Sequence, residues 1–365
     1  MVVFCDSQIP LLPELLGQKL DVIVYSGRHL NREDLISSNC EALFTRSSTK
    51  VNKDLLEGTN VKFIGSATSG IDHIDLDYLK AKGIYFTDAK GSNANSVAEY
   101  VIFSILHWHF TIGEEIKGSS IGIIGYGNIG KLVAKYSNHL GLKVLINDPP
   151  LKELINEGKA DDFPAYCKYC NLSEILSTAK IVTNHVPLTS TGKYPTYYLL
   201  NNRNLPLLLE NSLFVHTSRG GVVDEKALLV QKEKKGLALV IDVWENEPII
   251  NTNLLDCCLI ATPHIAGYSY EGKLRGTKKM IEEFSNFFGI NFDTTLLQNE
   301  LEQYKPISIQ NFESYSEIYN KINHSRQLLD DFVNFKKILH FKKPEEKSKY
   351  FDFLRKNYPK RREIL

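Results

Sequence analysis

The sequence predicts an α/β protein built from two doubly wound parallel sheets. Up to about Gly91, short apolar runs alternate with polar or helical stretches, which is the pattern of a parallel sheet covered by helices. The same alternation resumes farther along, where a glycine-rich loop follows the first apolar run. At 365 residues the chain exceeds what one hydrophobic core usually supports, so two or three domains are expected.

Two series of apolar runs give the predicted strands. The first sheet is expected from the runs VVFC, VIVYS, ALFTRS, VKFIGSA and IYFTD. The second is expected from the runs IGIIG, KVLIN, KIVTNHV, SLFVHT, LALVIDV and CLIATPHI. Apolar positions at helical spacing predict a long, buried helix from Asn93 to about Phe110 and an amphipathic helix from about Tyr270 to Phe288.

The segment beyond Asn291 differs in composition, and its last part is dense in Lys, Arg and Glu. A disordered tail is one interpretation of such a stretch. Its apolar content argues for a small third domain or a subunit contact instead, because a solvating tail has no use for this much apolar surface. The residues concerned are Tyr350, Phe351, Phe353, Leu354 and Tyr358.

Charge and composition favour a small molecule as the partner. The chain has 43 basic and 43 acidic residues, so electrostatics give no reason to expect binding to nucleic acid or to an anionic membrane. Its start lacks a basic region, carries Asp6 and Glu14 where a signal peptide would be apolar, and no apolar run nears the length of a membrane span. We therefore expect a cytoplasmic protein.

The six cysteines are too few and too unevenly placed for a disulfide framework, so reduced thiols are expected. Cys167 and Cys170 form a CxxC pair, but structural zinc needs four ligands. The nearest candidates, Cys257 and Cys258, are interpreted as the start of a strand. No metal site is predicted.

A glycine-rich loop in the second series predicts a dinucleotide site. Gly125 permits a tight turn, Gly127 allows the backbone to approach a pyrophosphate, and Gly130 allows a helix to pack closely on a strand. The next strand ends in Asp148, where an acid accepts hydrogen bonds from the adenosine ribose and disfavours the extra phosphate of NADP. The sequence therefore predicts NAD, although Asp148 could also be a turn residue before Pro149.

Three further residues at strand ends supply the groups that oxidation of a 2-hydroxy acid requires. Arg219 follows the strand SLFVHT, and its planar fork suits a carboxylate. His264 ends the strand CLIATPHI and can act as the base. Glu247 follows LALVIDV and can raise the affinity of that histidine for a proton. Each residue alone could be structural, but all three at carboxyl ends of strands predict an active site.

With these residues in place, the chain resembles the D-isomer-specific 2-hydroxyacid dehydrogenase family. The resemblance rests on GSNANSVAEYV, GIIGYGNIG, HVPLT, HTSRGGVVDEKAL, DVWENEP and PHIAGY, which occur in that order. It implies two Rossmann or flavodoxin-like domains and a small α+β C-terminal dimerisation domain. Residues 1–93 with 267–290 would bind substrate, residues 94–266 would bind NAD, and residues 291–365 would form a homodimer contact.

The resemblance also implies roles for individual residues. His264 would exchange a proton with the substrate hydroxyl while Glu247 holds its imidazole and Arg219 binds the carboxylate. The residues expected against NAD are Gly125, Tyr126, Gly127, Asn128, Ile129, Gly130, Asp148, Val186, Thr217, Asp242 and Gly267. The family member with such a C-terminal extension acts on a small phosphorylated 2-hydroxy acid, so the resemblance implies a substrate of this kind. The residues expected to contact it are Ser47, Thr68 and Tyr268.

Several alternatives remain open at this point. The polar run from Arg46 to Lys50 could supply phosphate donors or form a surface turn. The basic residues from Arg355 to Arg362 could reach a phosphate or form a solvated helix face. His216 replaces the asparagine usual in the family and could alter the pH profile. The activity could also be that of a phosphoglycerate dehydrogenase or a glyoxylate or hydroxypyruvate reductase, and a non-enzymatic NAD sensor is a further alternative.

Overall fold

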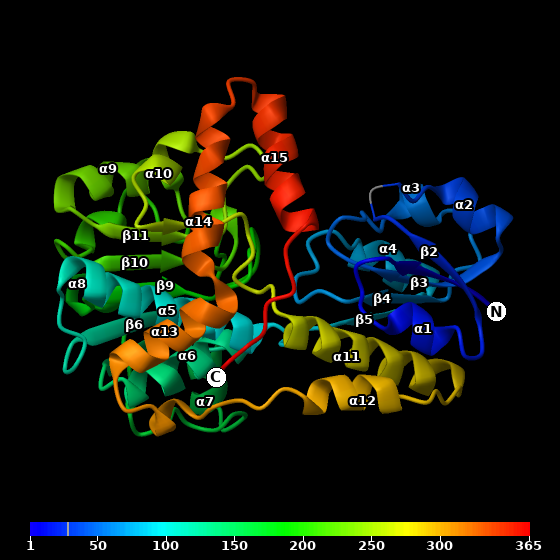
Figure 1. The fold of residues 1–365 in the computed structure, drawn as a ribbon, viewed down its shortest axis with the longest axis horizontal. Coiled ribbons are helices and arrows are strands. Elements are labelled where there is room, and N and C mark those ends of the chain that lie inside the picture. Colours follow the sequence, from blue (N-terminus) through cyan, green and yellow to red (C-terminus); the bar gives the residue numbers. More distant parts are fainter. Residues whose placement is uncertain (28) are drawn as a thin grey trace. The chain divides into compact units, whose positions relative to one another are not determined.

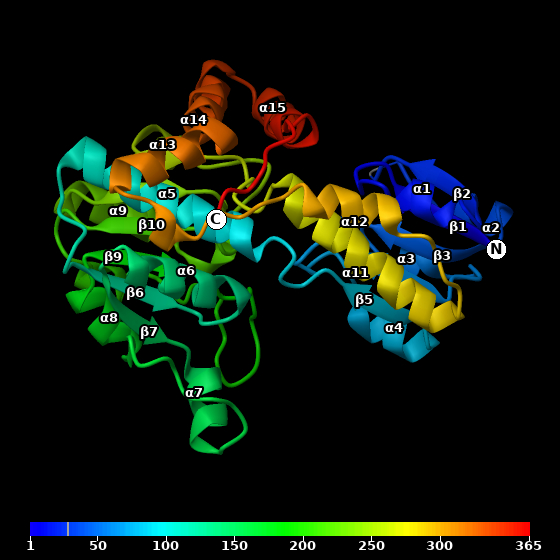
Figure 2. The same cartoon turned by 60° about the horizontal axis from the view of Figure 1, so that its bottom comes forward.

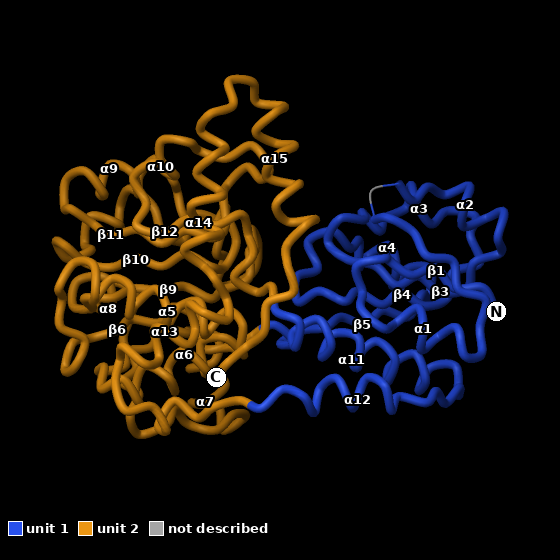
Figure 3. Tube along the Cα trace, viewed as in Figure 1, with its two compact units in different colours: residues 1–93, 269–305 blue, residues 94–268, 306–365 orange. Residues whose placement is uncertain are grey.

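The computed structural model describes residues 1–27 and 29–365, and the chain divides into two compact units (Figure 3). Unit 1 comprises residues 1–93 and 269–305, and unit 2 comprises residues 94–268 and 306–365. Each unit is built around one parallel sheet (Figure 1). The two doubly wound sheets predicted from the sequence are thereby confirmed.

Unit 1 has a five-stranded sheet in the order β2-β1-β3-β4-β5, with every neighbouring pair parallel. Its strands are β1 (Val2–Asp6), β2 (Asp21–Tyr25), β3 (Cys40–Thr45), β4 (Phe63–Ser66) and β5 (Tyr85–Asp88). Its helices are α1 (Leu12–Leu16), α2 (Arg32–Ser37), α3 (Lys53–Leu56), α4 (Leu76–Lys82), α11 (Tyr270–Phe288) and α12 (Thr295–Glu302).

The central strands of the unit 1 sheet, β1, β3 and β4, are covered on both faces, to which successive residues point alternately. Along β3, Phe44 belongs to the cluster that contains α1 and α11, whereas Leu43 belongs to the cluster that contains α2, α3 and α4. Phe284 of α11 lies edge-on to Phe63 of β4 at a centroid distance of 5.3 Å. The continuous apolar runs of the sequence therefore mark strands covered on both sides.

Unit 2 has a seven-stranded parallel sheet in the order β12-β11-β10-β9-β6-β7-β8. Its strands are β6 (Ser120–Ile124), β7 (Lys143–Asn147), β8 (Cys167–Tyr169), β9 (Ile181–Asn184), β10 (Leu213–His216), β11 (Ala238–Ile241) and β12 (Ile260–Ala261). Its α-helices are α5 (Ala94–Ile112), α6 (Asn128–His139), α7 (Pro149–Asn156), α8 (Leu172–Thr178), α9 (Glu225–Lys235), α10 (Thr252–Asp256), α13 (Tyr315–Arg326), α14 (Leu328–Lys336) and α15 (Pro344–Lys356).

The C-terminal helices of unit 2 pack on the elements that surround the parallel sheet of the same unit. Figure 2 shows α13 beside α5, and Tyr319 of α13 stacks on Phe103 of α5 at 5.0 Å. Phe335 of α14 contacts Trp244, which follows β11, at a centroid distance of 5.7 Å. The aromatic residues of the C-terminal segment therefore cover apolar surface within the chain.

The structure differs from the sequence-based expectations in three elements. Strand β8 was not predicted, and Cys257 and Cys258 follow α10 while β12 begins only at Ile260. The part of the structure covering residues 291–365 contains helices and no strand, in place of the expected α+β segment. Its buried residues, such as Ile318 and Ile322, recur at helical spacing, which explains the difference.

Residues 291–305 lie in unit 1 and residues 306–365 in unit 2. The division into a substrate domain, an NAD domain and a separate dimerisation domain therefore stays a prediction.

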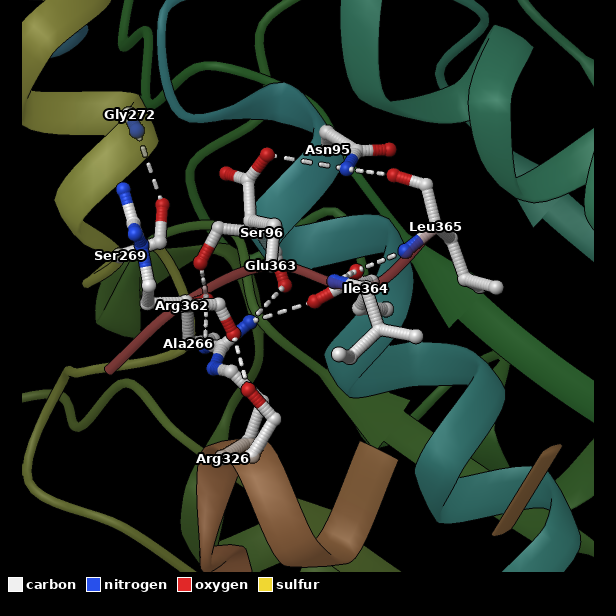
Figure 4. A network of polar contacts seen from close by, with 12 residues as sticks. Asn95, Ser96, Ala266, Ser269, Gly272, Arg326, Arg362, Glu363, Ile364 and Leu365 are labelled. Atoms are coloured by element: carbon white, nitrogen blue, oxygen red, sulfur yellow. Dashed lines mark hydrogen bonds and ion pairs between the residues drawn. The ribbon is translucent and has the colours of Figure 1, made fainter. Parts of the chain in front are cut away.

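A buried ion pair fixes the C-terminal segment to α5, and Figure 4 shows its arginine, Arg326, within the surrounding network of polar contacts. Arg326 of α13 lies 3.1 Å from Glu99 of α5, and both side chains are fully buried. The guanidinium also donates to the carbonyl oxygens of Ser96 and Ala266, at 3.2 and 3.1 Å. The pair stabilises the fold only while both charges are present, because a lone buried charge is strongly unfavourable. Through Ala266, this network reaches the loop that carries His264.

Within the described residues, no helix is long and apolar enough to cross a membrane. The six cysteines are all free thiols. In the same part of the chain, no three His, Cys, Asp or Glu side chains gather in a way that could hold a metal ion.

Candidate active site

The glycine-rich loop between β6 and α6 has the geometry of a phosphate cradle. Gly125 has a φ of +94°, a left-handed conformation that glycine adopts without strain. Gly127 stands at the N-cap of α6, where no side chain caps the helix, and a Cβ added to it would meet nothing within 4 Å. A Cβ on Gly130 would lie 2.1 Å from the Gly125 carbonyl oxygen. The loop therefore leaves the first amides of α6 open to an anion.

The side chains within the loop divide between packing and exposure. Tyr126 is buried, and its ring lies edge-on to Phe163 at 5.4 Å. Ile129 packs against the core, whereas Asn128 is exposed at the first position of α6. Val186 approaches from the end of β9, since its Cγ1 would lie 2.9 Å from a Cβ on Gly125. The loop after β9 therefore lines the glycine-rich loop.

Asp148 connects the glycine-rich loop to the following helix. One carboxylate oxygen accepts a hydrogen bond from the Tyr126 N–H at 2.7 Å, and the other accepts from Leu151 N–H at 3.0 Å as the N-cap of α7. The turn-residue interpretation is therefore correct in part. A carboxylate accepts about four hydrogen bonds, so the same group retains capacity for ribose hydroxyls.

We predict that Gly127→Ala weakens NAD binding without a loss of stability, whereas Gly130→Ala destabilises the fold. Gly127→Ala should leave the melting temperature nearly unchanged, because the added methyl group meets open space. It should weaken NAD binding, because that space is where a pyrophosphate would lie. Gly130→Ala should destabilise the fold by about 1–3 kcal/mol, since the methyl group collides with backbone. Thermal denaturation and NAD titration of both variants test this.

Glu247 and His264 form the hydrogen-bonded pair that the sequence predicts. The His264 Nδ1 lies 2.8 and 3.1 Å from the two carboxylate oxygens of Glu247. The Trp244 N–H donates to the same carboxylate at 2.9 Å. Both side chains remain partly exposed, at 30% for His264 and 20% for Glu247. With Nδ1 engaged, Nε2 is the imidazole nitrogen left to face a substrate.

The charge state of Glu247 suits this arrangement. Burial favours its neutral form, but the charge and hydrogen bond of His264, the charge of Arg355 and the Trp244 N–H outweigh burial and lower the pKa of the carboxyl group. Glu247 is therefore ionised near neutral pH and orients His264 as an acceptor.

The loop that carries Arg219 packs against the loop that carries Glu247. A Cβ on Gly220 would lie 1.9 Å from the Trp244 carbonyl oxygen, so the two backbones approach more closely than any side chain permits. The guanidinium of Arg219 donates to the Ser218 carbonyl oxygen at 2.7 Å and is half-buried. Arg219 thus stands at the end of β10, one strand from Glu247, as predicted from strand order.

Asp242 holds the loop of His264, a role that the sequence did not reveal. Its buried carboxylate accepts hydrogen bonds from the Thr262 hydroxyl and from the N–H groups of Ile265 and Ala266, at 2.6, 2.7 and 3.0 Å. His264 itself has a φ of +58°, an unfavourable conformation for a non-glycine residue, so the loop needs such support. The predicted contact of Asp242 with NAD stays a prediction.

The remaining site residues fall into both units. Thr217 is buried after β10, and Gly267 and Tyr268 are half-buried after the His264 loop in unit 2. Ser47 and Thr68 lie in unit 1, after the ends of the adjacent strands β3 and β4. Ser47 is exposed in a turn, so the polar run from Arg46 to Lys50 forms a surface turn, which is one of the two alternatives that the sequence left open.

Two histidines flank the site, the half-buried His185 and the buried His216, and neither titrates near neutral pH. Burial lowers the pKa of His185 and of His216 to about 3, because each would otherwise hold a charge away from water. The His216 Nδ1 lies 3.1 Å from the Asn184 side-chain oxygen. His216 is therefore neutral across the working pH, and we expect it to leave the pH profile unchanged.

These histidines should make the fold acid-sensitive. In the unfolded chain each takes up a proton below the ordinary histidine pKa of about 6.5, whereas the folded state keeps both neutral. The unfolded state then binds more protons, so stability falls as the pH falls, by about 1.4 kcal/mol per pH unit for each histidine. His216→Asn should remove its own contribution of about 1.4 kcal/mol per pH unit, while the opposing contribution of Glu99 and Glu225, whose pKa values burial raises to about 7, stays the same in both proteins. Urea unfolding between neutral pH and about 5 tests the prediction, and an unchanged slope in the variant would contradict it.

Comparison with known proteins agrees with this architecture. Residues 104–266 match the NAD binding domain of D-isomer specific 2-hydroxyacid dehydrogenases. Erythronate-4-phosphate dehydrogenase of Wigglesworthia glossinidia brevipalpis is 40% identical, with coverage of 100% of this chain and 92% of that relative. The protein of the same name from Shewanella loihica is 35% identical, with coverage of 100% and 93%.

Among solved structures, D-lactate dehydrogenase from Aquifex aeolicus, complexed with NAD and lactic acid, has a TM-score of 0.62 at 26% identity. The match covers 83% of this chain and 97% of that one.

The two parallel sheets, the phosphate cradle and the matched domain define an NAD-dependent dehydrogenase of the D-2-hydroxyacid class. Within this class, the chain belongs to the erythronate-4-phosphate dehydrogenase family, whose members align with its whole length. The motifs TRSSTKVNKDLL, VKFIGSATSGIDHID and HIAGYSYEGKLRGT already resembled this member of the class, and that resemblance is confirmed.

Proposed function

We propose that this protein oxidises 4-phospho-D-erythronate with NAD to 2-oxo-3-hydroxy-4-phosphobutanoate, a step of pyridoxal phosphate biosynthesis. Full-length similarity to proteins named erythronate-4-phosphate dehydrogenase supports the choice of substrate. The single observation that carries the chemistry is the Glu247–His264 pair, in the same unit as the open glycine cradle. NAD bound in that cradle supplies the acceptor for the hydride.

His264 acts as the base in this proposal. Its Nε2 takes the proton of the C2 hydroxyl while the hydrogen on C2 leaves as hydride, so that a C2 carbonyl forms. Glu247 stays ionised and keeps the Nδ1 proton in place, which favours the tautomer with a basic Nε2. In the reverse direction the imidazolium returns the proton to the carbonyl oxygen.

Arg219 binds the substrate carboxylate and polarises the C2 oxygen. Its planar fork matches a carboxylate, and a cation at this position stabilises the negative charge that develops on oxygen. The approach of its loop to that of Glu247 supports a fixed distance between the anion site and the base. Ser47, Thr68 and Tyr268 are the further substrate contacts in the proposal.

The homodimer and the cytoplasmic location also belong to this proposal. The exposed Val333 of α14 and Phe353 of α15 offer apolar surface for a second copy. Six free cysteines suit a reducing compartment. Truncation after Asn291 would remove residues that cover the unit 2 core, so it could unfold the protein. The better test of the dimer is a charged substitution at Val333 and at Phe353, with the oligomeric state measured by size exclusion.

Formation of NADH with a panel of 2-hydroxy acids tests the proposed function. We expect selective activity with 4-phospho-D-erythronate over 3-phosphoglycerate, glycerate and lactate. Activity only with another member of the panel would retain the dehydrogenase class and reject the substrate. No reduction of NAD with any of them would favour an NAD sensor.

A further inference from the structure

One cation of the C-terminal segment lies within the site described above. Arg355, near the end of α15, is the member of the basic run that reaches this region, and its Nη2 donates to the Tyr268 hydroxyl at 3.2 Å. Its guanidinium carbon lies 5.8 Å from the centre of the Tyr268 ring and 5.8 Å from that of Phe351. Tyr268 follows His264 by four residues, so Arg355 stands beside the catalytic loop.

The charge of Arg355 acts on that of Glu247, but Arg355 forms no ion pair with a carboxylate in the described part of the chain. Its Nε is buried and has no hydrogen-bond partner. The ion pairs found within residues 1–27 and 29–365 include none to Arg355, whereas Arg326, which is fully buried, is paired with Glu99. Arg355 as a whole is half-buried, but a buried donor without a partner is costly unless a ligand completes it. An anionic ligand would supply the missing acceptor for Arg355.

Two neighbours on the same run do not meet this description. Arg361 is paired with Asp331, at 3.7 Å. Lys356 is exposed, on the other side of α15 from Phe351. Spacing explains the difference, because Phe351 and Arg355 are four residues apart and share the buried face of the helix. Of these three residues, Arg355 alone has both a substrate-site neighbour and no ion pair, together with a buried Nε that lacks a partner.

We propose that Arg355, together with the Tyr268 hydroxyl, binds the phosphate group of the substrate. This deepens the proposed function and rests on it, since Arg219 already serves the carboxylate and a phosphorylated hydroxy acid carries a second anion. A hydroxyl that accepts a hydrogen bond from a cation donates its own proton more strongly, so Tyr268 and Arg355 together suit a phosphate dianion. Arg355 thereby makes the C-terminal segment part of substrate recognition.

The test compares a phosphorylated and an unphosphorylated substrate in Arg355 variants. For Arg355→Met, kcat/KM with 4-phospho-D-erythronate should fall by about 30- to 100-fold, while kcat/KM with D-erythronate should change by less than about threefold. Arg355→Lys should recover part of the loss, because a point charge replaces the bidentate fork. Lys356→Met is the matched control and should behave as the wild type with both substrates.

A merely positioning role predicts a different pattern. If Arg355 acted only through Glu247 or Tyr268, the Met variant would lose the same factor with both substrates and would shift the pH profile of kcat/KM. That outcome would overturn the proposal, as would unchanged kinetics.

Phosphorus NMR titration of each protein with inorganic phosphate separates this proposal from the proposed function. Should the wild type not oxidise 4-phospho-D-erythronate, weaker phosphate binding by Arg355→Met than by Lys356→Met would still support the anion site, and equal binding would reject it.

Discussion

Replacement of His264 by alanine should reduce kcat/KM by about three to four orders of magnitude, the largest loss expected from any single change in this protein. The variant lacks the base for the C2 hydroxyl proton, and a positioned general base contributes about 10²- to 10⁴-fold to such a reaction. The Glu247 carboxylate would also lose its partner at 2.8 Å. Binding of NAD should persist, because the glycine cradle lies on β6 and α6.

Steady-state kinetics beside an NAD titration separates the two effects in His264→Ala. Glu247→Gln serves as a graded control, since it keeps a hydrogen bond to Nδ1 and removes only the charge. We expect it to lose less than His264→Ala. A His264→Ala variant with more than about a tenth of wild-type kcat/KM would contradict a role in proton transfer.

Replacement of Arg219 by methionine should cost about 10²- to 10³-fold in kcat/KM. Methionine retains much of the side-chain volume but cannot bind a carboxylate or stabilise charge on the C2 oxygen. Arg219→Lys should recover only part of the loss, because an ammonium group does not reproduce the bidentate fork. Stability should change little, since Arg219 is only half-buried.

The division of the Arg219 effect between kcat and KM is informative. An increase in KM alone would indicate that the guanidinium binds ground state and transition state equally. A loss in kcat as well is expected if it also polarises the carbonyl. If both kcat and KM were unchanged, Arg219 would not be the residue that binds the substrate carboxylate.

The sequence predicted most strands and the two long helices, because these elements bury continuous or helically spaced apolar residues. The helix α11 occupies residues 270–288, as its amphipathic pattern indicated. Strand β8 escaped prediction because Cys167–Tyr169 is a short edge strand without a buried residue, so its sequence has no apolar run. The C-terminal segment was expected to contain strands by resemblance, and its own helical spacing was the better guide.

The site was predictable where it depends on strand ends and was not where it depends on tertiary packing. Arg219, Glu247 and His264 follow successive strands of one parallel sheet, so topology alone brings them to one edge. The contact between Arg355 and Tyr268 joins residues 87 positions apart and needed the structure. The same holds for the three hydrogen bonds that Asp242 accepts from the His264 loop.

The central claim is that hydride passes from C2 of a phosphorylated 2-hydroxy acid to NAD. The most direct test uses 4-phospho-D-erythronate that carries deuterium at C2, with mass spectrometry of the cofactor after reaction. We predict one deuterium atom in the reduced cofactor and a slower rate than with the unlabelled substrate if hydride transfer limits turnover. Reduced cofactor without deuterium, or none formed, would contradict the claim.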